Sequence, residues 1–261
     1  MKDSTGSTVR LEFRDSVAFL TLARPASANT MNLEFGRDFL AAAFAIEAAA
    51  ARAVVLTGEG KNFCFGGDLK GMVTSGADVG AYLRELTTNL HAGMALLARL
   101  DAPVIAAVNG TAAGAGLGLV LAADLAIAAR SAKFVSAYTA VGLTPDAGCT
   151  FLLPRAVGNK RAMELFLTNR MLDSQQALDW GLVNQVVPDE RLAEAAAALG
   201  AQLAAGPAGA FGAVKRLVAD AQPGFEVQLG RESRSISARG SQPEGREGIA
   251  AFLEKRTPQF R

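Results

Sequence analysis

The sequence has few of the residues that build disulfide frameworks or metal sites. Its 261 residues include two cysteines, Cys64 and Cys149, and a single histidine, His91. Two cysteines are too few for a disulfide framework, so a reducing compartment such as the cytoplasm is the simpler expectation. No spacing of histidine, cysteine and carboxylate residues matches a metal site, and we expect no metal.

An excess of one charge is also missing. The chain carries 26 lysine and arginine residues against 25 aspartate and glutamate residues, a net charge of +1. This balance gives no electrostatic reason to expect nucleic acid or an anionic membrane as a partner. The segment 1–10 lacks the apolar centre of a signal peptide. Residues 102–129 are poor in charge, but Asn109, Asp124 and several glycines interrupt them, which favours a buried strand–loop–helix–strand over a membrane span.

Apolar residues, in contrast, make up 50% of the chain, enough for a sizeable core. Their spacing predicts strands at 8–13, 17–22, 52–58, 103–110, 124–129 and 133–136. It predicts helices at 32–50, at 78–100 and from about 115 to 123. From about residue 150 onward the pattern becomes helical. The sequence therefore predicts an α/β core followed by a C-terminal helical region.

Two glycine-rich loops each follow a predicted buried strand. The first contains Gly66 and Gly67, and the second contains Gly114, Ala115 and Gly116 and opens a helix. Glycine lets a ligand approach the backbone closely, and a helix start offers free N–H groups and a positive dipole end. Two such loops can aim two backbone N–H groups at one oxygen, which forms an oxyanion hole. The alternative is that these glycines only permit tight turns and helix packing.

A dinucleotide-binding loop is the rival interpretation of the second loop, which also follows a strand and opens a helix. The spacing argues against it. After Gly114 and Gly116, that fingerprint requires its third glycine at position 119, where the chain has Leu119. We therefore do not expect a nicotinamide cofactor.

Both loops, with three further segments in the same order, resemble the enoyl-CoA hydratase/isomerase (crotonase) family. The resemblance covers nearly the whole chain from Arg24 onward. It is carried by NFCFGGDLKGM (62–72), PVIAAVNGTAAGAGLGLVLAADLAIAARSAKF (103–134), VGLTPDAGCTFLLPRAVG (141–158), DWGLVNQVV (179–187) and GIAAFLEKRTPQF (248–260). It implies an α/β fold, a crotonase-type spiral of ββα units that binds acyl-CoA over residues 1–190. Residues 191–261 would then be a C-terminal helical trimerisation region.

The resemblance also implies roles for individual residues. The backbone N–H groups of Gly67 and Ala115 would hold the enolate oxygen of an acyl-CoA thioester. Coenzyme A belongs to the substrate, so no separate cofactor is expected, and the assembly would be a homotrimer or homohexamer. A lysine matching Lys255 would reach coenzyme A from a neighbouring subunit. For Arg24 and Lys255 an ordinary solvated cation is the alternative. The positions that match the coenzyme A-binding segments are Arg24, Ala26, Asp68, Leu69 and Lys70.

The catalytic acids depart from the hydratase pattern. Hydratases of this family use two glutamates to hold and activate water, and the matching positions here are Gly118 and Tyr138. Neither can act as a carboxylate base, so ordinary hydration is not favoured, and Tyr138 is kept as a substrate-binding residue. Asp146 taken alone is most simply a helix N-cap. Isomerases of the family that lack the glutamates, including ring-epoxide phenylacetyl-CoA and dienoyl-CoA isomerases, carry an aspartate at this place. The resemblance thus implies an isomerase with Asp146 as its catalytic base, which shifts a double bond or rearranges a ring.

Two other interpretations stay open. Aromatic acyl-CoA dehalogenases also resemble this chain. In them an aspartate matching Asp146 attacks the ring and a histidine matching His91 activates water. The chain departs from them at Tyr138, where they carry tryptophan, and a lone helix histidine is often only structural. The other interpretation is a silent family member that binds coenzyme A, or acts in assembly or RNA binding, although the lack of a basic patch argues against RNA.

Overall fold

The computed structural model describes residues 4–5, 8–76, 78–221, 225–240 and 242–260. Residues 1–3 and 6–7, part of the segment in which we expected no signal peptide, lie outside the described residues. The strands are β1 Ser4–Thr5, β2 Val9–Arg14, β3 Val17–Leu22, β4 Ala53–Gly58, β5 Val104–Val108, β6 Ala112–Ala113, β7 Leu125–Ala129, β8 Lys133–Val135, β9 Leu172–Asp173 and β10 Gln185–Val187. The α-helices are α1 Leu33–Ala48, α2 Leu69–Thr74, α3 Val79–Arg99, α4 Ala115–Ala122, α5 Cys149–Val157, α6 Asn159–Thr168, α7 Ser174–Asp179, α8 Leu192–Ala204, α9 Ala208–Ala219, α10 Phe225–Gly240 and α11 Pro243–Glu254.

A seven-stranded sheet forms the centre of the molecule, in the order β1-β2-β3-β4-β5-β7-β10. Strands β1, β2 and β3 pair antiparallel, whereas β3, β4, β5, β7 and β10 pair parallel. The parallel strands β4 and β5 are almost continuously apolar because both of their faces are covered. A second sheet, in the order β6-β8-β9, stands beside the first. From β5 onward the chain crosses between the two sheets several times: β6, β8 and β9 lie in the small sheet, whereas β7 and β10 return to the large one.

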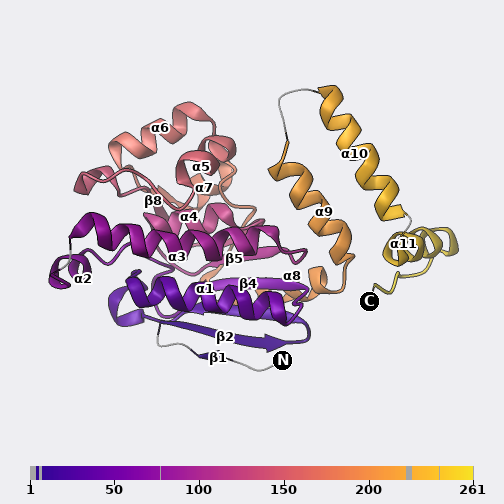
Figure 1. Cartoon of the computed structure of the whole chain (residues 1–261), viewed down its shortest axis with the longest axis horizontal. Coiled ribbons are helices and arrows are strands. Elements are labelled where there is room, and N and C mark those ends of the chain that lie inside the picture. The colour runs from indigo at the N-terminus through magenta and orange to yellow at the C-terminus, as the bar shows by residue number, and fades with distance from the viewer. Residues whose placement is uncertain (1–3, 6–7, 77, 222–224, 241, 261) are drawn as a thin grey trace.

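Helices cover the large sheet on both sides. Figure 1 shows α1 and α3 side by side in front of it. The two helices approach closely because Gly93 of α3 has no side chain: a Cβ there would lie 2.7 Å from the ring of Phe39. Helix α8 packs against β4, β5 and β7, with Gly200 facing Val55 and Val17. Helix α8 follows residue 190 and yet packs against the sheet built by the preceding part of the chain. The division of the chain at residue 190 stays a prediction.

The last three helices extend to one side of the sheet, as Figure 1 shows for α9, α10 and α11. Helix α9 is tied to the core by Lys215, whose Nζ lies 2.8 Å from Asp124 Oδ2 and donates to the carbonyl oxygen of Ala102 at 2.9 Å. Among the described residues, no single helix has both the length and the apolar character to cross a membrane. The pair Asp189–Ala204 and Ala208–Ala219, bent by 102°, passes that test only when taken together.

Candidate active site

The two glycine-rich loops lie in backbone contact. Cys64 of the first loop accepts a hydrogen bond at its carbonyl oxygen from Ala113 N at 2.8 Å, and its N–H donates to Thr111 O at 3.1 Å. Gly66 has a φ of +80°, and a Cβ there would lie 3.1 Å from Ala115 N. Gly116 is equally confined, since its Cβ would lie 2.2 Å from Cys64 O. Glycine is required at both positions because neither offers room for a side chain.

The predicted oxyanion donors, Gly67 and Ala115, sit on either side of this contact. Ala115 is the first residue of α4, so its N–H has no acceptor within the helix. Gly67 forms a parallel bridge with Met31: Met31 N donates to Gly66 O at 2.8 Å, and Asp68 N donates to Met31 O at 2.9 Å. The structure thus brings both residues to one junction. Their shared role toward one oxygen stays a prediction.

A buried asparagine that no sequence pattern singled out fixes the first loop. Asn29 is fully buried, and its Nδ2 donates to the carbonyl oxygens of Glu59, Asn62 and Phe63 at 2.8–3.1 Å. Its Oδ1 accepts from Arg24 N at 2.9 Å. The only sequence signal was an asparagine in a polar turn before a predicted helix, which is too common to single out.

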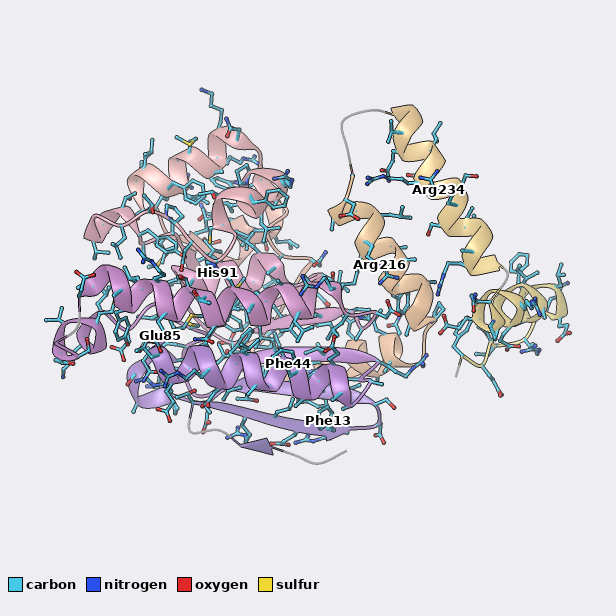
Figure 2. All side chains as sticks on the ribbon, in the orientation of Figure 1. Phe13, Phe44, Glu85, His91, Arg216 and Arg234 are labelled. Atoms are coloured by element: carbon cyan, nitrogen blue, oxygen red, sulfur yellow. The ribbon has the colours of Figure 1, made fainter. Side chains whose placement is uncertain are left out.

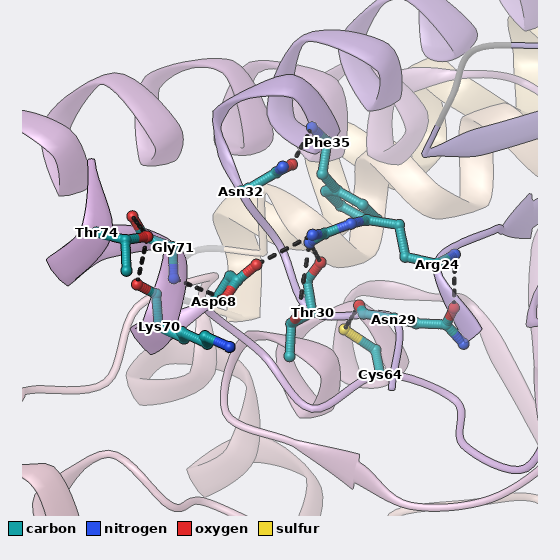
Figure 3. Close-up of polar contacts among 10 residues, drawn as sticks. All are labelled: Arg24, Asn29, Thr30, Asn32, Phe35, Cys64, Asp68, Lys70, Gly71 and Thr74. Carbon is teal, nitrogen blue, oxygen red and sulfur yellow. Dashed lines mark hydrogen bonds and ion pairs between the residues drawn. The ribbon is translucent and has the colours of Figure 1, made fainter. Parts of the chain in front are cut away.

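Two of the predicted coenzyme A-binding residues are bound to each other. Arg24 Nη2 lies 3.0 Å from Asp68 Oδ2, and Arg24 Nη1 donates to Thr30 O at 2.5 Å (Figure 3). Asp68 also caps α2, because its Oδ1 accepts from Gly71 N at 2.9 Å. Arg24 is therefore not an ordinary solvated cation: it ties the segment before α1 to the start of α2. Its predicted contact with coenzyme A stays a prediction.

The other predicted coenzyme A-binding residues are exposed. Ala26 lies in the short 3₁₀ turn Pro25–Ser27, and Leu69 and Lys70 begin α2. Lys255 is the left-handed C-cap of α11. Helices α2 and α11 lie at opposite ends of the molecule in Figure 1, so one chain does not bring Lys255 to the others.

The position of the first hydratase glutamate is closed by the backbone. A Cβ on Gly118 would lie 2.5 Å from Ala147 Cβ and 2.7 Å from Ala147 O. Ala147 is buried and has a φ of +48°, which presses the turn after Asp146 against α4. The chain therefore lacks this carboxylate, and it also lacks the space for one.

Asp146 does not cap α5. The helix begins at Cys149 with Gly148 as its N-cap and no side-chain cap, so the N-cap interpretation is wrong. Instead, Asp146 Oδ1 accepts a hydrogen bond from the Tyr138 hydroxyl at 2.5 Å. The Asp146 side chain is 29% exposed. One carboxylate oxygen is thus engaged, and the carboxylate keeps access to the outside.

His91 lies on α3, as Figure 2 shows, and its ring is close to the Asp146 carboxylate. Its Nε2 is 3.7 Å from Asp146 Oδ2, too long for a hydrogen bond. The same Nε2 accepts from Ala147 N at 3.1 Å. A ring nitrogen that accepts an N–H carries no proton, so this hydrogen bond requires the tautomer of His91 that is protonated at Nδ1. The structure brings His91 and Asp146 together, but Nε2 of His91 is already occupied by the hydrogen bond from Ala147 N.

The tyrosine and the thiol beside Asp146 are held in their protonated forms. Tyr138 is 9% exposed, and Cys149 is fully buried with its Sγ 3.9 Å from the Tyr138 hydroxyl. Burial, reinforced by the nearby Cys149 and Asp146, raises the pKa of Tyr138 far above its ordinary value. Burial raises the pKa of Cys149 to about 12, and the same cause raises the pKa of Cys64 to about 12. With pKa values this high both thiols stay protonated near neutral pH, and a protonated thiol is a poor nucleophile.

Within the ranges that the structure describes, no group of three or more histidine, cysteine, aspartate or glutamate residues is arranged to hold a metal ion. The side chains gathered around Asp146 are the Tyr138 phenol, the His91 imidazole and the Cys149 thiol, and the predicted backbone donors are Gly67 and Ala115. Such a set polarises a carbonyl and moves a proton.

Comparisons with known proteins bear on the family and the fold. A probable enoyl-CoA hydratase of Rhodobacter capsulatus is 42% identical over 254 residues, covering 97% of each chain. The 1,2-epoxyphenylacetyl-CoA isomerase of Escherichia coli is 41% identical over 250 residues, covering 94% of each. The crystal structure of an enoyl-CoA hydratase from Polaromonas superposes with a TM-score of 0.92 at 34% identity, covering 97% of this chain and 99% of the other. The family model for enoyl-CoA hydratase/isomerase matches residues 12–261. The expected crotonase-type fold is confirmed, and the chain belongs to the enoyl-CoA hydratase/isomerase family.

Proposed function

We propose that this enzyme is an acyl-CoA isomerase, which shifts a double bond or rearranges a ring through a thioester enolate. One combined observation carries the proposal: the carboxylate of Asp146 is accessible, whereas the position of Gly118 has no room for a second carboxylate. A hydratase must hold water between two carboxylates. This site offers one carboxylate and a phenol, which supports isomerisation over hydration. The similarity to the Escherichia coli epoxide isomerase supports the same choice, whereas the name of the Rhodobacter relative favours a hydratase.

The proposed reaction needs only groups of the chain and the substrate. Asp146 takes a proton from the carbon next to the thioester carbonyl of a 3-enoyl-CoA. The electron pair moves into the carbonyl, and the N–H groups of Gly67 and Ala115 hold the resulting enolate oxygen. Asp146 then returns the proton to the γ-carbon, and the double bond re-forms between the α- and β-carbons. One carboxylate serves both steps because these carbons are roughly 2.5 Å apart on a bound chain.

A panel of substrates tests the proposal. Purified protein is incubated separately with 3-enoyl-CoA, trans-2-enoyl-CoA and 4-chlorobenzoyl-CoA, and products are identified by mass and chromatography. We expect 2-enoyl-CoA from the first and no 3-hydroxyacyl-CoA from the second. Rapid hydration of trans-2-enoyl-CoA would contradict the proposal. No turnover of any substrate would favour a silent coenzyme A-binding protein.

Hydrolytic dehalogenation is the second candidate, and the 3.7 Å separation of His91 and Asp146 favours it. In that reaction His91 would have to take a proton from water at Nε2, which already accepts the N–H of Ala147. Because Nε2 is already occupied, dehalogenation is the weaker of the two candidate functions. Chloride release from 4-chlorobenzoyl-CoA in the same panel would reverse the order.

We also propose that the enzyme assembles as a homotrimer or homohexamer. Large apolar side chains are exposed on the C-terminal helices: Ile236 of α10 is 73% exposed, and Phe252 and Leu253 of α11 are 83% and 73% exposed. Association removes such surfaces from water, and it would bring Lys255 to a neighbouring site. Light scattering should give three or six times the 27.0 kDa chain mass, and a monomer would contradict this proposal.

A further inference from the structure

Tyr138 links the two halves of the proposed site. Its hydroxyl donates to Asp146 Oδ1 at 2.5 Å, while its Cζ lies 3.9 Å from the position that a Cβ on Gly114 would take. Gly114 directly precedes Ala115, the proposed oxyanion donor. The rigid ring of Tyr138 therefore reaches from the second glycine-rich loop to the Asp146 carboxylate, and it is almost completely buried.

The contact has the short length of a strong hydrogen bond. A separation of 2.5 Å is typical of a hydroxyl that donates to an ionised carboxylate. Because burial raises the pKa of Tyr138 far above its ordinary value, the hydroxyl keeps its proton throughout the working pH range. The phenol is thus a donor to Asp146 and not a base.

We propose that Tyr138 is the positioning residue of the isomerase, which holds Asp146 Oδ1 so that only Oδ2 faces the substrate at a fixed distance from the oxyanion loop. This inference rests on the proposed function. A carboxylate that shuttles a proton between two carbons must not rotate away between the two steps. The hydroxyl supplies that restraint. Tyr138 also occupies the sequence position at which the resemblance puts the second glutamate of a hydratase.

The test combines Tyr138→Phe with Asp146→Asn. Phenylalanine keeps the ring against Gly114 and removes only the donor. We expect kcat for 3-enoyl-CoA isomerisation to fall about 10- to 100-fold with KM nearly unchanged, because misplacement of a catalytic group by about 1 Å costs up to about 10²-fold. In the Asp146→Asn background, the same change should have little further effect, because residues that act as a unit are not additive. Single-turnover measurements with excess enzyme keep the slow variants measurable.

Tyr82→Phe is the matched control, since Tyr82 is the other tyrosine of the chain and is also buried. It should leave kcat unchanged, and thermal melting should show both phenylalanine variants folded.

An equal loss from Tyr138→Phe in both backgrounds would overturn the inference, because Tyr138 would then act without Asp146. A raised KM at constant kcat would also overturn it and return Tyr138 to substrate binding. If Asp146→Asn itself retains the wild-type rate, the proposed function fails. If only Tyr138→Phe does so, this inference alone fails.

Discussion

At the scale of single residues, Gly118 shows how one missing side chain restricts the chemistry. A Cβ at this position would come within 2.5 Å of Ala147 Cβ. Real side chains do not approach so closely, so the turn at Ala147 would have to move. Asp146 belongs to the same turn. The closed position at Gly118 and the placement of the Asp146 carboxylate therefore depend on the same close packing.

Gly118→Ala should lower the free energy of unfolding by about 1–3 kcal/mol, the usual cost of overpacking a filled interior. Urea denaturation would measure the change. Gly230→Ala on α10 is the control, because its nearest neighbour would be Arg234 Nη1 at 3.6 Å and alanine favours a helix. Equal stability of Gly118→Ala and the wild type would show that the turn is not closely packed.

These residue-scale contacts were the least visible in the sequence. Taken alone, Asp146 was interpreted as a helix N-cap, which is wrong. Its catalytic role came only from the resemblance and stays a prediction. Its actual partners depend on the left-handed turn at Ala147, a residue whose side chain gives no sign of positive φ. The hydrogen bond that Tyr138 donates to Asp146 and the one that Ala147 N donates to His91 both depend on that turn.

At the scale of elements, the side chain of His91 joins the turn after Asp146 to α3. His91 Nε2 accepts the N–H of Ala147, which is buried. A buried N–H without an acceptor costs free energy, so His91 has a structural role that needs no chemistry. This role agrees with the expectation that a lone helix histidine is often structural.

His91→Ala should lower the free energy of unfolding by about 1–3 kcal/mol, because Ala147 N–H loses its acceptor. His91→Gln should lose less, because a glutamine side-chain oxygen can accept the same N–H. Chemical denaturation of the three proteins measures the order. A fully stable His91→Ala protein would place the acceptor of Ala147 elsewhere.

Most of the longer elements were predictable from periodicity. The helices expected at 32–50 and 78–100 are α1 and α3, and the strands expected at 17–22 and 52–58 are β3 and β4. The two-residue strands β6 and β9 and the six-residue helix α2 were not predicted, because so few residues carry no measurable period. Their places are set by contacts between loops distant in sequence.

At the scale of the whole molecule, folding buries both thiols. Burial raises the pKa values of Cys64 and Cys149 to about 12, whereas a thiol in an unfolded chain has a pKa of about 8.5. Because each thiol has a higher pKa in the folded protein than in the unfolded chain, its contribution to the free energy of unfolding is complete below about pH 8.5. That contribution is lost as the pH rises toward 12.

Each thiol should therefore reduce the free energy of unfolding by about 1.4 kcal/mol per pH unit between roughly pH 9 and 12. Urea denaturation as a function of pH should show this slope. The double variant Cys64→Ala/Cys149→Ala should have a flatter alkaline dependence, which separates the thiols from other titrating groups. Identical slopes in both proteins would mean that the thiols ionise equally well in the folded state.

The central claim is that Asp146 is the proton shuttle of an acyl-CoA isomerase, and the rate of 3-enoyl-CoA isomerisation by Asp146→Asn tests it most directly. Asparagine has the same shape and still offers Tyr138 an acceptor oxygen, so the fold and coenzyme A binding should remain. The rate should fall by about 10²–10⁴, the usual contribution of a positioned acid–base group. Isomerisation at the wild-type rate would show that another group moves the proton and would contradict the account.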